Sequence, residues 1–538
     1  MNMQIIQLPE QLSSVVSSND SMRLYLENLL LGHKATDRSW LYEDVKNADD
    51  ILDTWMHHLK CLETGSSFEA NVYQFDTSQI EKWGPQGAVP PIAEIMDIVE
   101  AGFSLAASPQ PAAFTTSEWK QALDLTEKQL WQMGCYSLRP ASYKHVVDDM
   151  RARDTLESNS GWPDFARRNL PDVKQHALVD ARDGNWKSYP AIALFRNYNQ
   201  KTRLVWMFPM STNIVEGSFF QPLQSKIMNA KMRGAYDFSY NSNPWEFFSP
   251  WKGFDQVRRN ITEAYREGLY IAASDFSSTD AHFTHWATQE VSQVLERCFQ
   301  ARYANDLRES LLHMQSIPLV IGPDSMITGD HGVSSGSNWT NFIETIFDMI
   351  LANYVTIITN SVHEGMYAIG DDMSWWSLDY DDAFAKELET IGKDVGQEIK
   401  ADKTTNDPDK VKSLQRLFQR GYSNQSGYIR GVYSTVRALK SSVYPEKFHK
   451  PKLWNSDMFC ARQYMILENC VDHPLFEEFV KFVVMGQKDL IPFARKTRFE
   501  LDRILRETKL LPGLNPTYNQ ERRDQSLTDF ESIKYAKS

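Results

Sequence analysis

The sequence feature that most constrains the fold is a pair of adjacent aspartates, Asp371 and Asp372, set between the apolar runs MYAI and MSWWS. Two short apolar runs on either side of a glycine-containing turn are typical of a β-hairpin. Neighbouring side chains on a strand point to opposite faces, so only a tight turn brings both carboxylates to one site. Gly370 gives that turn its backbone freedom. Two anions held together need a cation, and Mg²⁺ binds carboxylates together with substrate phosphates. Taken alone, this tripeptide is better explained as an ordinary Asp-rich turn, because Gly-Asp-Asp is common by chance.

A third and a fourth carboxylate lie upstream, in ASDFSSTDAHF. The apolar run LYIAAS (269–274) predicts a buried strand that ends at Asp275, and Asp280 follows five residues later. A carboxylate at a strand end could meet the hairpin pair across neighbouring strands. Two metal ions about 3.5–4 Å apart could then hold the attacking and leaving oxygens of a phosphoryl transfer. An isolated Asp-x4-Asp carries little weight by itself.

Between these carboxylates lies GVSSGSNWTNFIETIF (332–347). The pattern is helical from Ser335 to Thr359, and Ser334 to Ser337 read as a small flexible loop at the start of that helix. Backbone N–H groups in such a loop can approach a sugar–phosphate closely. Thr340, four residues after Gly336, is expected on the first helical turn, facing the loop. A plain capped helix is the alternative explanation.

The order of the three patterns is more specific than any one of them. Asp-x4-Asp, then Ser-Gly-x3-Thr, then Gly-Asp-Asp resembles palm motifs A, B and C of viral RNA-dependent RNA polymerases. Four further segments resemble motifs G, F, D and E of that family: SNSGWP (158–163), RNYNQKTRLVWMFP (196–209), IGKDVGQEIKADKT (391–404) and SLQRLFQR (413–420). The form SGSNWT, the chain length and YPEKF (444–448) are most similar to polymerases of small double-stranded RNA viruses, first picobirnaviruses and then partitiviruses.

The resemblance implies an α+β multidomain chain with a right-hand polymerase fold, whose palm is an antiparallel sheet backed by helices. The expected boundaries are 1–70 for an N-terminal helical extension, 71–212 and 286–330 for the fingers, 213–285 and 331–420 for the palm, and 421–538 for the thumb with a polar C-terminal tail. Outside the motifs this division rests on analogy.

The resemblance also implies a role for each motif residue. Asp275 and Asp371 would hold two Mg²⁺ ions, with Mn²⁺ as a substitute, and Asp372 would support the second metal. Asp280 would hydrogen-bond the ribose hydroxyls, and Lys403 would protonate the leaving pyrophosphate. The other nucleotide-binding residues would be Arg203, Lys201 and Arg196 at the triphosphate, and Ser335, Gly336 and Thr340 in the motif B loop. The RNA-binding residues would be Ser160, Gly161, Arg416 and Arg420.

One position departs from the family pattern. The family commonly has Asn four residues after the motif B threonine, and this chain has Glu344 there. Thr340 and Glu344 share a helix face, so Glu344 is expected near Asp280 and the ribose. Asn341 is present but lies about a quarter turn away. Sugar selection should therefore rest on Asp280 and Ser335, and Glu344 could carry a shared proton.

The net charge of −13 and a pI near 5.5 argue, taken alone, against a nucleic-acid partner. The charge is uneven, however. Residues 191–260 hold nine basic and four acidic side chains, and residues 411–463 hold ten basic and two acidic ones. Solvated surface is the ordinary explanation for either segment, but the two coincide with the expected triphosphate cover and thumb. The expected partners are an RNA template, nascent RNA and NTPs, with a viral capsid protein as a further candidate.

The remaining features indicate compartment rather than chemistry. The five cysteines are widely spaced without a CxxC, which favours a reducing compartment over a disulfide framework or zinc site. The start, MNMQIIQLPEQL, lacks the pattern of a signal peptide, and the apolar tract near 346–359 is too polar to span a bilayer. We therefore expect action in a virion interior or the host cytoplasm. Local or structural roles are expected for the histidine pairs and for the two tryptophans beside the hairpin: His57, His58, His282, His285, Trp375 and Trp376.

Residues 1–70 and those after 410 read as mostly helical. The tail after Pro512 is expected either to be disordered or to fold back toward a template channel. Two other functions stay open: a reverse transcriptase, and an inactive polymerase-like RNA-binding scaffold. A reverse transcriptase usually has an aromatic residue before the x-Asp-Asp, where this chain has Ile369.

Overall fold

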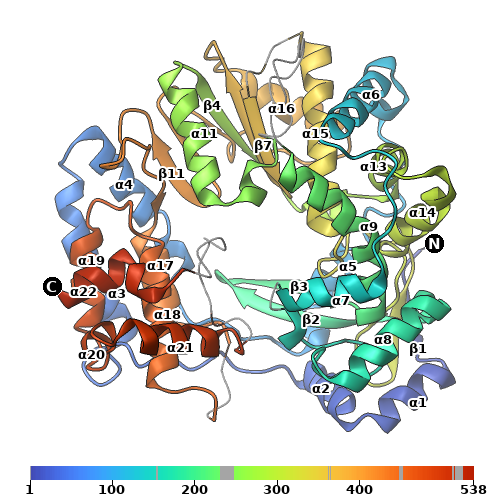
Figure 1. Cartoon of the computed structure of the whole chain (residues 1–538), viewed down its shortest axis with the longest axis horizontal. Coiled ribbons are helices and arrows are strands. Elements are labelled where there is room, and N and C mark those ends of the chain that lie inside the picture. Colours follow the sequence, from blue (N-terminus) through green and yellow to red (C-terminus); the bar gives the residue numbers. More distant parts are fainter. Residues whose placement is uncertain are drawn as a thin grey trace.

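The protein is described from a computed structural model that covers residues 2–152, 155–230, 247–360, 363, 365–447, 452–511, 514 and 525–538. Lys231, Arg233 and Lys450 of the basic segments, and most of residues 512–524 in the tail, lie outside the described residues. The described chain combines many helices with three sheets, whose strand orders are β7-β8-β4-β9, β1-β6-β5-β2-β3 and β10-β11-β12 (Figure 1).

The sheet that carries the aspartates is antiparallel throughout. Its strands are β7 (Gly365–Ile369), β8 (Asp372–Ser377), β4 (Tyr270–Asp275) and β9 (Thr405–Asn406). The predicted hairpin is confirmed, since β7 and β8 pair from Ile369 opposite Asp372 outward. The predicted strand ending at Asp275 is confirmed as well.

One long apolar helix backs this sheet: α15 (Thr340–Thr359), which is buried along nearly all of its length. It begins five residues later than its sequence pattern suggests, because 335–339 form the loop that holds it against its neighbours. Among the described residues, this is the one helix with the length and composition of a membrane span, but 83% of the relevant window is buried inside the protein. Its burial is that of a core helix.

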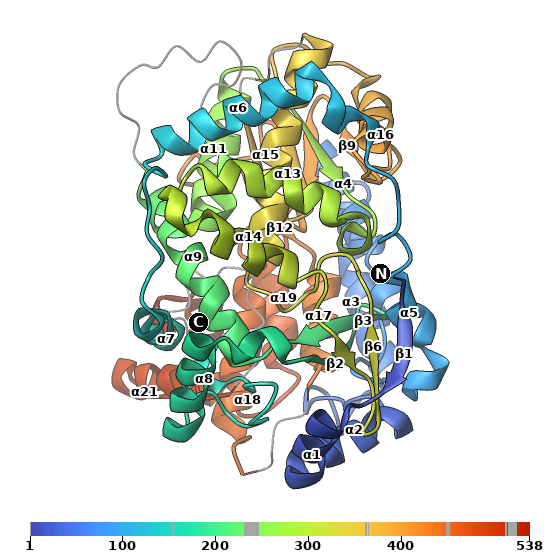
Figure 2. The ribbon, with the colours of Figure 1, turned by 90° about the vertical axis from the view of Figure 1, so that its right-hand side faces the viewer.

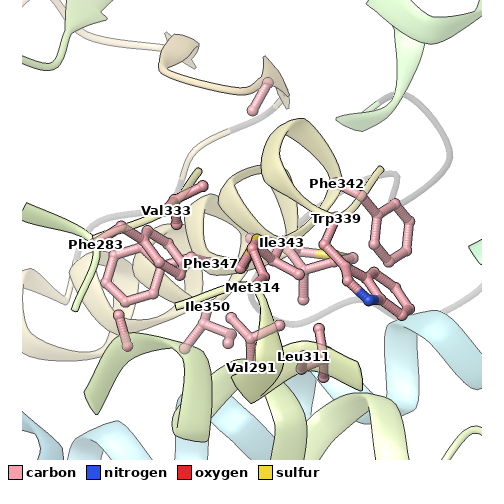
Figure 3. Close-up of a cluster of buried hydrophobic side chains, with 14 of the residues drawn as sticks. Phe283, Val291, Leu311, Met314, Val333, Trp339, Phe342, Ile343, Phe347 and Ile350 are labelled. Carbon is pink, nitrogen blue, oxygen red and sulfur yellow. The ribbon is translucent and has the colours of Figure 1, made fainter. Parts of the chain in front are cut away.

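The core around α15 is aromatic and aliphatic. Figure 3 shows Phe283, Val291, Leu311 and Met314 meeting the α15 side chains Phe347 and Ile350. The supporting helices are α6 (Ser117–Gln132), α11 (Phe254–Arg266), α12 (Thr279–His282), α13 (His285–Glu296), α14 (Ala304–His313) and α16 (Phe384–Asp394). Trp375 and Trp376 are buried in two such clusters, as expected.

The five-stranded sheet brings together strands that lie far apart in the sequence. Its strands are β1 (Gln4–Gln7), β6 (Ser325–Thr328), β5 (Leu319–Val320), β2 (Ala191–Tyr198) and β3 (Lys201–Met207). β1 pairs with β6 in antiparallel register, and Figure 2 shows them side by side. The prediction of helix throughout 1–70 is wrong at β1, because its partner strand is distant in sequence and leaves no local signal. Five further helices come before β2 in the sequence: α1 (Glu10–Ser18), α2 (Asp20–Leu31), α5 (Met96–Ala101), α7 (Tyr143–Ala152) and α8 (Pro171–Asp183).

The C-terminal third packs together with an N-terminal segment. α3 (Ala48–Leu59) and α4 (Ser67–Thr77) share one hydrophobic core with the C-terminal helices, and Figure 1 shows these blue helices among the red ones. Those helices are α17 (Thr435–Val443), α18 (Ser456–Glu468), α19 (Phe476–Val484), α20 (Leu490–Ala494), α21 (Arg498–Thr508) and α22 (Glu531–Lys537). The expected N-terminal extension is thus divided between the β1 sheet and this core.

A three-stranded sheet interrupts the helical pattern expected after residue 410. Its strands are β10 (Lys410–Ser413), β11 (Arg416–Gln419) and β12 (Val432–Tyr433). Leu414 and Gln415 join the first two strands with φ of 50° and 61°. Two-residue hairpin turns of this kind usually contain Asn or Gly, so the sequence carries no clear turn signal here.

The described end of the tail is ordered on the C-terminal core. Ile533 of α22 is fully buried, and the Ser532 hydroxyl donates to the Glu468 carboxylate at 2.9 Å. None of residues 525–538 lines the central cavity. For residues 525–538, the predictions of disorder and of docking in a template channel are both wrong, because the apolar side chains of this segment complete the core beside α18 and α19.

Candidate active site

A cavity of about 1990 Å³ opens between the aspartate sheet, the β2–β3 hairpin and the C-terminal core. It gathers residues that lie far apart in the sequence. Those predicted as site residues and lining it are Arg196, Lys201, Arg203, Asp275, Asp280, Ser335, Gly336, Thr340, Asp371, Asp372, Lys403 and Arg416. Ser160, Gly161 and Arg420 are not among its lining residues.

The catalytic candidates meet at one end of the antiparallel sheet. Asp275, the last residue of β4, is the register partner of Asp372, the first residue of β8. Gly370 makes the turn before the aspartate pair with φ of +59°, and its N–H donates to the Thr345 hydroxyl of α15 at 2.9 Å. A Cβ at Gly370 would lie 2.6 Å from the Asn341 side-chain nitrogen. The turn therefore needs glycine, and α15 holds it in place.

The three carboxyls are crowded, and their pKa values report it. Burial raises the pKa of Asp275, while Lys403, Lys201 and Arg203 oppose the rise. Burial and the Asp275 charge raise the pKa of Asp371. Burial, Asp371 and Asp275 together raise the pKa of Asp372 to about 7. The protein's own cations thus leave part of this negative charge uncompensated.

A divalent cation would supply the missing compensation. In the part of the chain that the structure describes, no group of three or more His, Cys, Asp and Glu side chains is placed so that it could hold a metal ion. Mg²⁺ does not require one, since it usually takes one or two carboxylates and completes its shell with substrate phosphates and water. The oxygen-only donors of Asp275, Asp371 and Asp372 fit that cation.

The loop before α15 holds Asp280 from the other side. The Ser335 hydroxyl donates to the Asp280 carboxylate at 2.6 Å, and the Thr340 hydroxyl donates to the Ser334 carbonyl at 2.8 Å. Gly336 has φ of +127°, and a Cβ there would lie 1.9 Å from the Trp206 carbonyl oxygen. The Trp206 N–H donates to the Ser335 carbonyl at 2.7 Å. The loop is thus fixed against β3, so Thr340 and Ser335 lie as the sequence predicted.

Glu344 lies where the helix periodicity placed it. Its carboxyl shares a hydrogen bond with Asp280, and burial together with the Asp280 and Asp371 charges raises its pKa well above the ordinary value. One turn further along α15, burial and the Glu344 charge raise the pKa of Asp348 in the same direction. The shared proton that the sequence suggested for Glu344 stays a prediction, which this hydrogen bond to Asp280 supports.

The cations differ in how free they are to meet a triphosphate. Arg203 lines the cavity, and its charge lowers the pKa values of Asp275, Asp280 and Asp371. Arg196 instead makes two hydrogen bonds to the Glu446 carboxylate, at 2.6 and 2.7 Å. The Lys403 ammonium donates to the Ser277 hydroxyl at 3.4 Å, two residues from Asp275.

The residues predicted to bind RNA are held by the protein itself. Ser160 is buried, and its hydroxyl accepts from the Ala166 N–H at 3.2 Å. Arg416 is 2% exposed, donates to the carbonyls of Gly431 and Asn469, and lies 4.1 Å from the centre of the Phe254 ring. Arg420 donates to the Leu269 carbonyl at 2.7 Å.

These contacts give Arg416 and Arg420 a structural role, and RNA binding by either residue stays a prediction. Both guanidinium groups join the three-stranded sheet to neighbouring elements, and Arg416 is almost fully buried although its residue borders the cavity. A basic segment in sequence does not reveal which of its charges is already occupied by backbone carbonyls. Gly161 adopts φ of +67° and packs under the Phe208 carbonyl, which shapes the loop rather than offering a side chain.

Sequence reasoning missed two site residues on α9 (Met210–Asn229), namely Asn213 and Glu216. The Glu216 carboxylate accepts from the Ser337 hydroxyl at 2.6 Å and from the Asn338 N–H at 2.8 Å. The available signal was a lone Glu in the otherwise uncharged run MSTNIVEGSFF, because an ionisable group in a buried part of a helix needs dedicated partners.

Comparison with known proteins agrees with this geometry. A family model described as viral RNA-dependent RNA polymerase matches residues 198–447. A human picobirnavirus protein (strain Human/Thailand/Hy005102/-), named as a potential RNA-dependent RNA polymerase, is 26% identical over 491 residues, which cover 87% of this chain and 86% of that protein.

Two crystal structures match nearly the whole chain. The RNA-dependent RNA polymerase of a human picobirnavirus has a TM-score of 0.80 at 22% identity, covering 98% of this chain and 99% of that one. The insertion-loop deletion mutant of a human picobirnavirus polymerase has a TM-score of 0.79 with the same identity and coverage. The predicted α+β right-hand polymerase fold is confirmed. The order of its motifs, the match over residues 198–447 and this fold make the chain similar to the viral RNA-dependent RNA polymerases.

Proposed function

We propose that this chain copies the genome of a double-stranded RNA virus, and that one active site serves both transcription and replication. The observation that carries the proposal is the meeting of Asp275, Asp371 and Asp372 at the end of one antiparallel sheet, in a cavity also lined by Arg203 and Lys201. The reaction is attack of the RNA 3′-hydroxyl on the α-phosphate of an NTP, with release of pyrophosphate.

Asp275 and Asp371 would hold two Mg²⁺ ions, with Asp372 in support, and the ions would supply Lewis-acid activation of the attacking hydroxyl and of the leaving phosphate. The chain's own residues position the nucleotide. Arg203 and Lys201 neutralise the triphosphate, and Arg196 contributes less because Glu446 already holds it. Such fixed charges act without reorganisation as the transition state forms.

Two other groups complete the reaction. Asp280, held by Ser335, accepts a hydrogen bond from the ribose 2′-hydroxyl and so selects ribonucleotides. Lys403, beside Ser277 and Asp275, donates a proton to the pyrophosphate as it leaves. Gly336 and Thr340 shape the loop that carries Ser335.

The decisive assay uses purified protein, Mg²⁺ or Mn²⁺, an RNA template and labelled NTPs. The wild type should extend RNA, and Asp371→Ala should abolish product, since one of the carboxylates expected to hold metal is lost. Asp379→Ala, which removes an exposed carboxylate on the loop after β8, is the matched control and should keep full activity. Activity that survives Asp371→Ala would defeat the assignment.

The same assay separates the other candidate functions. A reverse transcriptase would prefer dNTPs, but Asp280 and Ser335 present a polar pair to the sugar where a bulky residue would exclude the 2′-hydroxyl. An inactive scaffold would bind RNA without product, although every expected carboxylate is present. Association with a capsid protein, inside a virion or in the host cytoplasm, is testable by co-sedimentation of the enzyme with assembled particles.

A further inference from the structure

A buried carboxylate outside the sequence motifs holds the loop that selects the nucleotide. Glu216 of α9 is 1% exposed, and its two oxygens accept from the Ser337 hydroxyl, the Asn338 N–H and the Asn213 side-chain amide at 2.6, 2.8 and 3.1 Å. Ser337 and Asn338 belong to the same loop as Ser335. Glu216 therefore holds this loop through Ser337 and Asn338, and the same loop holds Asp280 through Ser335.

The same network continues to a second loop. Asn213 accepts from the Arg168 guanidinium at 2.9 Å, and Arg168 also donates to the Asn159 carbonyl at 3.0 Å. The Asn213 side-chain amide donates further to the Gly336 carbonyl at 3.3 Å. Arg168, Asn213 and Glu216 thus connect the 158–161 loop to the 334–338 loop through side chains alone.

Supporting a loop with a buried ionic network costs free energy of desolvation. Desolvation of a carboxylate and a guanidinium costs more than apolar packing would, so a role in geometry rather than stability is the physical reason for such a group. The network leaves little freedom to Ser335, whose hydroxyl must stay within reach of Asp280.

We propose that Glu216 is a positioning residue for nucleotide selection, and that Arg168 and Asn213 hold the 158–161 and 334–338 loops in one register. The inference rests on the proposed polymerase function. It predicts that weakening the hydrogen bonds of Glu216 to the loop lowers the affinity for NTP and the discrimination against dNTP. The reason is that Ser335 then no longer holds Asp280 in one orientation.

The test compares steady-state kinetics of Glu216→Gln with the wild type. The variant should raise the KM for NTP about tenfold or more, with a smaller fall in kcat, and the ratio of ribo- to deoxynucleotide incorporation should fall with it. Ser337→Ala, which removes one donor to the carboxylate, should shift both quantities in the same direction by less.

The matched control is Glu290→Gln. Glu290 is another buried carboxyl, 6% exposed, and it accepts from the Trp119 indole N–H at 2.9 Å, away from the cavity lining. It should leave the KM and the sugar ratio unchanged. Equal effects of Glu216→Gln and Glu290→Gln, or an unchanged KM and ratio in a Glu216→Gln enzyme with wild-type melting, would overturn the proposal.

A double-mutant cycle tests the link between the two loops. Arg168→Gln and Glu216→Gln, measured singly and together on the KM for NTP, should be non-additive because both act through Asn213. Strict additivity would remove Arg168 from the proposal. If Glu216→Gln fails to fold, Ser337→Ala decides alone: an unchanged sugar ratio in that variant overturns the role of the network. An inactive wild type would instead contradict the proposed function itself.

Discussion

At the scale of single residues, this site is a set of carboxyls that lie too close together to be ionised independently. Asp280 and Glu344 share a hydrogen bond, and Asp348 lies one turn deeper in α15. Burial raises the pKa of each of these carboxyls, and neighbouring negative charge raises those of Glu344 and Asp348 further. Protonation and hydrogen bonding at these residues should therefore decide how the ribose is read.

Glu344→Ala should reduce discrimination between ribo- and deoxynucleotides by about tenfold, because Asp280 loses a hydrogen-bond donor. Glu344→Gln keeps a side-chain donor toward Asp280 and should retain most of the discrimination. Single-nucleotide incorporation of matched NTP and dNTP measures the ratio. A ratio that is the same for the wild type and Glu344→Ala would exclude Glu344 from sugar selection.

Glu216 should make stability depend on pH. Burial raises its pKa to about 7 from the ordinary 4.5, and hydrogen bonds from Ser337 and Asn338 and the Arg168 charge oppose the rise only in part. Between those values the folded state binds more protons than the unfolded chain, so stability falls as pH rises. Glu216→Gln cannot ionise and escapes this loss.

Denaturant unfolding of the wild type and of Glu216→Gln at pH 5 and pH 8 measures that loss. Relative to the wild type, the variant should gain up to roughly 3 kcal/mol between the two pH values. Other titrating groups are common to both proteins and cancel in the difference. A stability difference that does not change with pH would show that Glu216 keeps an ordinary pKa.

At the scale of elements, α4 is tied to the C-terminal core by a buried polar cluster. Asp76, at the end of α4, accepts from the Ser434 hydroxyl at 2.5 Å, the Thr435 hydroxyl at 3.0 Å and the His473 ring at 2.7 Å. Both Asp76 and His473 have fully buried side chains. These contacts hold an N-terminal helix in the C-terminal core.

Asp76→Ala should destabilise the protein by about 3 kcal/mol or more, because it leaves Ser434, Thr435 and His473 buried without their shared acceptor. Asp53→Ala, on the exposed side of α3, is the matched control and should change the free energy of unfolding by less than about 0.5 kcal/mol. Equilibrium unfolding in denaturant compares the two. Similar values for both variants would mean that the cluster contributes little.

At the scale of the whole molecule, the chain closes around its cavity. The tip of the β2–β3 hairpin meets α17, where the Lys440 ammonium lies 4.6 Å from the centre of the Tyr198 ring and donates to Asn199. Burial and the Arg437 charge lower the pKa of Lys440 to about 7. This contact joins the β2–β3 hairpin to the C-terminal core.

Tyr198→Ala should weaken that closure and let RNA leave the cavity more readily. Product length and RNA retention should fall, and the fall should be larger at high salt, while incorporation of the first nucleotide changes less. Tyr428→Ala, at an exposed ring outside the cavity lining, is the control. Unchanged product lengths for Tyr198→Ala would show that the contact does not retain RNA.

The net charge of −13 also changes meaning at this scale. Arg203, Lys201 and Lys403 line the cavity, whereas Arg416, Arg420 and Lys440 are occupied by protein groups. The net charge counted over residues 411–463 therefore overstated how many cations this segment can present to RNA. The interior cations near the aspartates are the ones that a triphosphate would meet.

The polymerase fold was implied by the resemblance of the ordered motifs to a known family. The local chemistry of the sequence was enough to predict the aspartate hairpin, the strand ending at Asp275 and the α15 face that carries Thr340 and Glu344. Each depends on short-range spacing, which sets which side chains share a turn or a face. The pairing of β1 with β6, the joining of α4 to the C-terminal core and the burial of Arg416 depend on the tertiary structure. So does the role of Glu216, because the partners that make a buried carboxylate tolerable come from a loop more than one hundred residues away.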